Sequence, residues 1–201
     1  MSEKKRTSIK DDFTLMAMLL IPIAIAVNVI GGQIASLLKL PVYLDTIGTL
    51  LIAILAGPWV GALTGLLSNL IHGIFDPTFI PFAIVSVVVG LVAGFFSRVK
   101  LFSTIWKSIL SGILIGLLAA VSSAPIAAYL FGGVTSSGST LITGVLLAAG
   151  QNLLQSVLTA SIITDLTDKT ISCLICFFIL KSMSSRYLSK FSLGTNYIRK
   201  Q

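Results

Sequence analysis

Charged residues are scarce in this chain of 201 residues. Aspartate, glutamate, lysine and arginine make up 10% of the sequence and hydrophobic residues 55%, whereas about a quarter of a typical soluble domain is charged. So few charges cannot cover a water-exposed surface. The composition therefore predicts an integral membrane protein in contact with a lipid bilayer.

Further absences restrict the chemistry. The chain has one histidine and two cysteines, so the HExxH motif and histidine-rich metal sites are excluded. The GxSxG motif of serine hydrolases and the glycine-lysine motif of P-loop ATPases are also missing. Cys173 and Cys176 stand in an apolar run without a second ligand pair, as expected of small buried residues. We predict no enzyme activity, no cofactor and no metal site.

What is present is a series of long apolar segments. A membrane-spanning helix needs about 20 apolar residues to cross about 30 Å of hydrocarbon, so the length of the chain suits about six spans. The predicted fold class is an all-α integral membrane protein with six transmembrane helices and both termini cytoplasmic. The predicted helices are 13–38, 45–56, 58–74, 79–96, a fifth that begins near 104, and a final span that begins near Asp168 and Lys169.

The number of spans has an alternative. Segments 141–164 and 170–183 are both apolar enough to cross, which would give seven spans. Because Gln151, Asn152 and Gln155 interrupt the first of these segments, we interpret it as a partly embedded outer segment. The seven-span alternative stays open.

Basic residues mark the ends predicted to be cytoplasmic. Apart from Lys39 and Lys169, they precede the first span, occupy the 98–107 connection or follow the last span, which indicates topology and not a surface for nucleic acid. The predicted organisation is a cytoplasmic tail (1–12), one membrane domain (13–184) and a basic cytoplasmic tail (185–201). The final tail is expected to place Tyr187, Phe191 and Tyr197 at the lipid interface.

Small residues recur at helical spacing in two places. Gly57, Gly61 and Gly65 follow one another at intervals of four, which puts them on one helix face. Ala17 and Ala24 contribute to a similar face on the first helix. Such faces allow close approach of another helix in lipid, so these five residues are predicted to pack helices or to dock a partner.

Polar residues at membrane depth are costly and often functional. The Gly57–Pro58 turn should fold Asp45 back toward Asn69 and His72, which makes this hairpin a candidate floor for a small-molecule pocket. The full set of candidate substrate-binding residues is Asp45, Asn69, His72 and Asp76, with Tyr43 and Phe79 for ring stacking, and Gln151 and Asn152 from the later segment, where Asp165 and Asp168 are further candidates.

Several candidates have an ordinary structural alternative, whereas Asn69, which continues the glycine face into the membrane, and Asn152 with Gln151 are harder to explain in this way. The aromatic residues could form an interfacial belt, and His72 could be a capped interfacial histidine. Asp76 precedes Pro77 and could be a turn residue, while Asp168 and Lys169 could simply begin the last helix.

Several segments resemble the substrate-binding S component of energy-coupling factor (ECF) vitamin transporters. They are 43–49 (YLDTIGT), 56–69 (AGPWVGALTGLLSN) and 124–133 (APIAAYLFGG), followed by Asp168-Lys169 in a last span that ends in Lys181 and Arg186. One departure concerns the AxxxA motif typical of the first helix of that family. Here Ala17 is followed four residues later by Ile21.

The resemblance implies a six-helix protein of the bacterial plasma membrane that captures a vitamin or related micronutrient. It also implies three partners, namely a membrane coupling protein and two ATP-binding subunits. The substrate itself stays open, although the aromatic residues favour a ring-bearing molecule. An alternative function is a ligand-sensing membrane domain that acts through a signalling partner, which would need an output domain that the short C-terminal tail does not supply.

Overall fold

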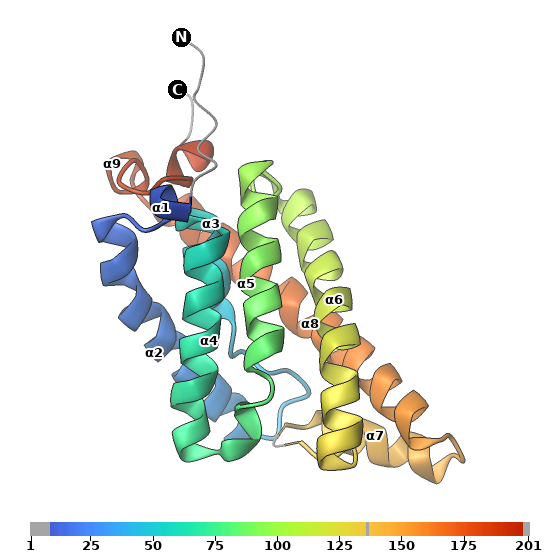
Figure 1. The fold of residues 1–201 in the computed structure, drawn as a ribbon. Helices are drawn as coiled ribbons and strands as arrows, with labels where there is room; N and C mark the ends of the chain where they lie inside the picture. The colour runs from blue at the N-terminus through green and yellow to red at the C-terminus, as the bar shows by residue number, and fades with distance from the viewer. Residues whose placement is uncertain (1–8, 136, 199–201) are drawn as a thin grey trace.

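The computed structural model describes residues 9–135 and 137–198, and this part of the chain consists of helices and their connections, with no strand (Figure 1). The predicted all-α class is confirmed. The bundle consists of α2 (Leu15–Leu37), α3 (Ile47–Ala56), α4 (Pro58–Phe75), α5 (Ala83–Arg98), α6 (Ile105–Phe131) and α8 (Leu153–Ser182). Shorter elements lie at its two ends: α1 (Ile9–Asp12), η1 (Pro77–Phe79), α7 (Ser139–Ala148), α9 (Ser185–Leu188) and η2 (Gly194–Tyr197).

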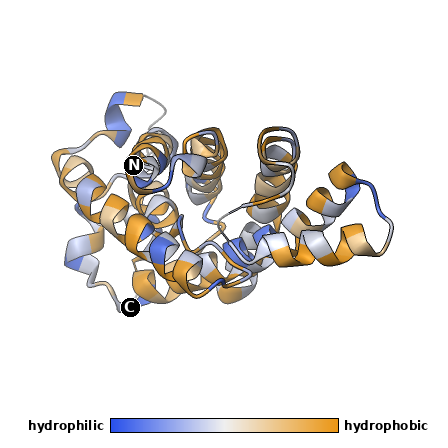
Figure 2. Ribbon diagram, turned by 90° about the horizontal axis from the view of Figure 1, so that it is seen from below, coloured by the Kyte–Doolittle hydropathy of each residue, from blue (hydrophilic) through white to orange (hydrophobic). Residues whose placement is uncertain are grey.

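The outer faces of the bundle are suited to lipid. Helices α2 and α6 are each long and apolar enough to cross a membrane. Their exposed side chains include Leu19 and Ile23 on α2 and Val121 on α6, each at least 60% exposed. Figure 2 shows that hydrophobic residues make up much of the length of the helices. Exposed apolar surface of this extent is what hydrocarbon solvation requires.

Helix α3 is short and almost entirely buried. Ten residues rise about 15 Å, roughly half of the hydrocarbon thickness. Other segments satisfy its terminal backbone groups. Asn28 Oδ1 accepts a hydrogen bond from the Gly48 amide (2.7 Å) at one end, and Ser192 Oγ donates to the Ala56 carbonyl (2.6 Å) at the other. The helix therefore ends inside the protein without unpaired backbone groups at these positions.

The C-terminal segment folds onto the bundle. Besides the contact of Ser192, the Leu193 amide donates to the Leu55 carbonyl of α3 (2.9 Å). Phe191 is 2% exposed and Tyr197 8%, and the Tyr197 hydroxyl lies 2.8 Å from Ser97 Oγ. The prediction that Phe191 and Tyr197 lie at the lipid interface is wrong, because the end of α3 supplies carbonyl groups and apolar surface that this segment covers. Tyr187 remains partly exposed.

The glycines of α4 lie in close helix contacts. Gly61 faces the backbone of Gly90, and Gly65 faces that of Ser86, both on α5. A methyl group on Gly61 would lie 2.9 Å from the Gly90 carbonyl oxygen and 2.5 Å from the Ala53 Cβ. Gly57 joins α3 to α4. Its φ of 125° is a conformation that other residues rarely adopt.

The alanines of α2 also face inward. Ala17 and Ala24 are buried in a cluster with Ile52 of α3 and Val60 of α4. Their small side chains let α2 pack closely on these helices. The structure thus gives both alanines a role in packing within the chain, and docking of a partner through them stays a prediction.

Asp12 joins three helices at the end of the bundle that carries α1 and α9. Its carboxylate accepts a hydrogen bond from the Trp59 amide in the first turn of α4 (3.4 Å) and pairs with Arg98 at the end of α5 (3.2 Å). Burial raises the pKa of the Asp12 carboxyl above its ordinary value, and the Arg98 guanidinium opposes that rise. Of the predicted tails, residues 1–8 and 199–201 lie outside the described residues.

The last long helix begins earlier than predicted. Helix α8 runs unbroken from Leu153 to Ser182, so a start near Asp168 is wrong. The break lies at Gly150, whose φ is 90°, and at Asn152, whose side chain accepts a hydrogen bond from the Gln155 amide and caps α8 (2.9 Å). Helix α7 and the first turns of α8 extend away from the other helices (Figures 1 and 2).

Candidate functional site

A cavity lies between helices α2 to α5 on one side and α6 to α8 on the other. It encloses about 870 Å³ of space, its open mouth included. Its walls come from α2, the 38–46 connection, η1, α5, α6, the 132–138 connection, α7 and α8. Since η1 and α7 lie at the end of the bundle opposite α1 and α9 (Figure 1), the cavity belongs to that opposite end.

One wall of the cavity is the irregular segment 38–46. It occupies the length of the bundle that the short α3 leaves free, and Leu44 has a φ of 53°. The Tyr43 and Leu44 amides donate to Asp168 Oδ1 of α8 (3.0 and 2.8 Å), and the Leu40 carbonyl accepts from Gly138 (3.0 Å). Irregular backbone at membrane depth is tolerated where protein groups satisfy it or where it lines a cavity.

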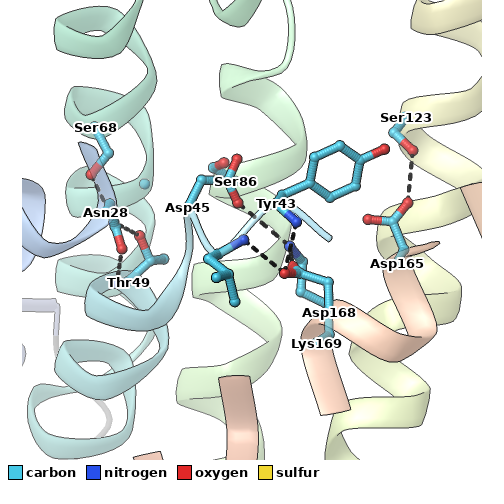
Figure 3. Close-up of polar contacts among 12 residues, drawn as sticks. Asn28, Tyr43, Asp45, Thr49, Ser68, Ser86, Ser123, Asp165, Asp168 and Lys169 are labelled. Carbon is cyan, nitrogen blue, oxygen red and sulfur yellow. Dashed lines mark hydrogen bonds and ion pairs between the residues drawn. The ribbon is translucent and has the colours of Figure 1, made fainter. Parts of the chain in front are cut away.

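A cluster of charged side chains lies next to this segment (Figure 3). Lys169 Nζ is 2.5 Å from Asp168 Oδ2 and 3.7 Å from Asp45 Oδ1. One turn earlier on α8, Asp165 Oδ2 accepts a hydrogen bond from Ser123 Oγ of α6 (3.1 Å). Asp165, Asp168 and Lys169 are at most 3% exposed. Buried charges persist only when they are paired and hydrogen-bonded, so this cluster depends on the arrangement of α6, α8 and segment 38–46.

The remaining walls divide into a polar and an apolar part. Hydroxyl groups of Thr135, Ser137 and Ser139 bond to one another at 2.9 to 3.3 Å, and Tyr43 Oη lies 3.4 Å from Ser139 Oγ. Across the cavity, η1 and α5 contribute aromatic and aliphatic side chains, Phe79, Phe82, Val85 and Val89. Pockets with this division hold small ring-bearing molecules, which stack on the apolar wall and bond to the polar one.

Three of the predicted binding residues line the cavity, namely Tyr43, Asp45 and Phe79. His72 does not, because it stacks behind Phe79 with ring centroids 3.7 Å apart, and its Nε2 lies 3.1 Å from Gln33 Nε2. His72 and Asp45 both pack around Gly32, as the folding of the hairpin predicts.

Asn69 lies one layer behind the cavity. Its Nδ2 donates to Ser86 Oγ (2.6 Å), and Ser86 lines the cavity. Asn69 Oδ1 is buried without a partner. The position of Asn69 therefore suits the positioning of Ser86, and direct contact with a ligand stays a prediction.

The other three predicted residues lie outside the cavity lining. Asp76 Oδ1 accepts hydrogen bonds from the amide and the hydroxyl of Thr78 (3.0 and 2.7 Å), and so caps η1. Gln151 and Asn152 lie at the break between α7 and α8, where Asn152 is the N-cap. The structure gives Asp76 and Asn152 capping roles, and ligand roles for all three stay predictions.

Sequence reasoning did not single out Thr46, Ser86, Ser123 or Lys169 as site residues, yet all four line the cavity. One pattern in the sequence could have identified Lys169 as a site residue. Polar residues recur along α8 every three or four positions, which marks one polar helix face. The residues of this face are Ser161, Thr164, Asp165, Asp168, Lys169 and Ser172.

A comparison with protein-family models matched this chain to a known family. The model is described as the ECF transporter, substrate-specific component, and it matches residues 16–180. Neither the comparison with curated proteins nor that with solved structures gave a match. Within residues 9–135 and 137–198 no group of three or more His, Cys, Asp or Glu side chains is arranged to hold a metal ion. The chain therefore belongs to the substrate-specific components of ECF transporters, which are membrane transport proteins that bind a substrate and are not enzymes.

Proposed function

We propose that this chain captures a vitamin or related micronutrient with high affinity and delivers it to an ECF-type importer in the bacterial plasma membrane. The observation that carries the proposal is the cavity, which combines an aromatic wall with a buried charged and hydroxyl-bearing wall. Because the sequence has no P-loop motif, the energy for import comes from elsewhere. A membrane coupling protein and two ATP-binding subunits would supply it.

The distribution of basic residues supports a direction for the cavity. Arg98, Lys100, Lys181 and Arg186 belong to the end of the bundle that carries α1 and α9, away from the cavity (Figure 1). Basic residues are enriched on the cytoplasmic side of membrane proteins. We infer six spans with both termini in the cytoplasm and the cavity accessible from outside.

The direct test is to purify the chain from its native membrane and to identify co-purifying small molecules by mass spectrometry. Uptake of the identified molecule is then measured in cells that express the chain with or without the coupling protein and ATPases. We expect a bound organic molecule whose uptake requires all partners. A chain that binds no small molecule and supports no partner-dependent uptake would refute the proposal.

Orientation is tested by cysteine labelling with a membrane-impermeant maleimide. Thr195→Cys and Asn152→Cys place exposed thiols at opposite ends of the bundle, while the native Cys173 and Cys176 are buried and serve as an unreactive background. In intact cells we expect labelling at position 152 and none at position 195. Labelling at position 195 and none at position 152 would overturn the orientation. It is also the result expected of seven spans, because position 152 would then lie inside a span.

A further inference from the structure

The cavity holds more carboxylates than cations. Among the described residues that line it, the ionisable side chains are Asp45, Asp165, Lys169 and Tyr43, and a tyrosine is uncharged at neutral pH. Lys169 is closest to Asp168, which is fully buried behind the lining. One ammonium group therefore faces three carboxylates.

The hydrogen bonds show which carboxylates are already satisfied. Asp168 uses one oxygen for the two amides of segment 38–46 and the other for Lys169. Asp45 Oδ1 is buried, has no hydrogen-bond donor and lies 3.7 Å from Lys169 Nζ. Asp165 receives a hydrogen bond from Ser123. Asp45 and Asp165 thus retain capacity for a further donor.

Among the described residues that line the cavity, Lys169 is the only cationic side chain. His72 also lies close to Asp45, but it is behind Phe79 and faces Gln33. An imidazole is mainly uncharged above about pH 7. A buried carboxylate without a cation either takes up a proton or is balanced by a bound positive group. A positively charged group of a ligand would balance the excess of carboxylates in the cavity.

An independent observation points to a ligand at the same place. Thr46 lines the cavity and is 2% exposed, yet its Oγ1 has no hydrogen-bond partner. Buried hydroxyl groups are normally paired. Thr46 follows Asp45 directly and both line the cavity, so a ligand in the cavity meets both residues. Phe79 and Phe82 also line the cavity and offer aromatic rings, which favour a ring and a positive charge in the ligand.

We propose that the ligand carries a protonated nitrogen on or beside an aromatic ring, and that Asp45 and Asp165 balance its charge. This inference rests on the proposed function and names the chemical class of its substrate. A phosphate or carboxylate ligand would add a like charge to a buried excess of carboxylates, which low-dielectric surroundings make costly.

The test uses three probes of nearly identical shape and different charge. Benzamidine is cationic, benzamide neutral and benzoate anionic. Their binding to the purified full-length chain, freed of co-purified ligand, is measured by isothermal titration calorimetry at neutral pH. We expect benzamidine to bind at least about tenfold more tightly than benzamide, and benzoate to bind most weakly. Equal binding of the three, preference for benzoate, or no binding of benzamidine at millimolar concentration would overturn the inference.

Variants assign the charge to particular residues. Asp165→Asn keeps an oxygen that can accept from Ser123 and removes the charge, and Asp45→Asn removes the charge next to Thr46. Each should weaken benzamidine binding by about tenfold and leave benzamide binding nearly unchanged. Asp11→Asn, in α1 at the other end of the bundle, is the matched control. If both cavity variants behave like this control, the assignment to Asp45 and Asp165 is wrong. If a variant fails to fold, the ranking of the three probes in the unmodified chain decides alone.

The two proposals fail separately. An anionic molecule that co-purifies and is imported with the partners would overturn the inference about charge and leave the proposed function intact. Tight binding of benzamidine without partner-dependent import of any molecule would overturn the proposed function and leave the charge preference of the cavity standing.

Discussion

Among the described residues, most buried polar side-chain atoms without a hydrogen-bond partner lie toward the cavity end of the bundle, although Arg98 Nε at the other end also has none. At the end with α1 and α9, the Asp12 carboxylate bonds to Arg98 and to the Trp59 amide, and the final carbonyls of α3 are capped by the C-terminal segment. At the cavity end, irregular segments replace helix, and polar atoms such as Thr46 Oγ1 remain without a partner.

From this contrast we infer that groups at the α1 and α9 end contribute mainly to stability and groups at the cavity end mainly to ligand binding. Paired polar groups and close glycine contacts hold the helices together, while unpaired groups in a cavity reduce stability in the absence of a ligand and contribute to its binding. Removing a paired group should therefore cost folding free energy, whereas removing an unpaired cavity group should cost affinity alone. Three predictions examine that division.

The largest effect is expected at Asp168, a fully paired carboxylate next to the cavity. Asp168→Leu leaves Lys169 buried without its closest partner and deprives the Tyr43 and Leu44 amides of their acceptor. Breaking a buried ion pair costs about 3–5 kcal/mol, so the chain should lose most of its folded population, as measured by size-exclusion chromatography and thermal unfolding in detergent.

Asp168→Asn is the matched control, since its amide oxygen still accepts from the two backbone groups, and it should be less destabilised than Asp168→Leu. If Asp168→Leu unfolds at the temperature of the unmodified chain, the carboxylate does not hold segment 38–46 in place.

An intermediate effect is expected at the glycine contact between α4 and α5. Gly61→Ala places a methyl group against Ala53 and the Gly90 carbonyl, and overpacking of this kind costs about 1–3 kcal/mol. The control is Gly144→Ala on the exposed face of α7, where no atom lies within 4 Å of the added methyl group. Thermal unfolding should separate the two variants clearly, and equal melting temperatures would contradict a close α4–α5 contact.

The smallest effect on stability is expected at Thr46. Thr46→Val removes a buried hydroxyl that has no partner, so the free energy of unfolding should stay the same or rise slightly. Affinity for the co-purified ligand should fall by roughly fivefold, the value of one neutral hydrogen bond, as measured by calorimetry.

Thr49→Val is the matched control for Thr46→Val, because it removes the same hydroxyl group from a position where that group is paired. Its hydroxyl accepts a hydrogen bond from Asn28 (2.8 Å) and lies in the core, so this variant should lose about 1 kcal/mol of stability and keep its affinity for ligand. A Thr46→Val variant that is destabilised as much as Thr49→Val would show that the Thr46 hydroxyl is paired in the folded protein.

Contacts set by local spacing could be predicted from the sequence. Glycines at intervals of four share a helix face whatever the rest of the fold, and Gly61 and Gly65 do meet α5. Tyr43, Asp45 and Phe79, which line the cavity, could also be predicted as candidates, because they are aromatic or acidic side chains next to predicted helix ends.

Contacts between distant segments could not be predicted in this way. No local pattern connects Asp168 with Tyr43, 125 positions apart. Without that contact, Asp168 and Lys169 resemble the start of a helix, whereas they lie in the middle of α8.

Hydroxyl residues were also hard to assign. Serine and threonine often bond to a carbonyl of their own helix, as Thr64 does to Val60 and Ser122 to Leu118. In the sequence these residues look the same as Ser123 and Ser139, which line the cavity.

The contact between segment 38–46 and Asp168 also imposes an order on biosynthesis. Ribosomes add about 5–20 residues per second, so the Tyr43 and Leu44 amides emerge many seconds before their acceptor on α8 has been made. Helices α2 to α6 can enter the membrane during that interval, but the wall formed by segment 38–46 has no anchor. A nascent chain that stops before α8 therefore lacks one wall of the cavity, and the last long helix to be translated completes the first connection.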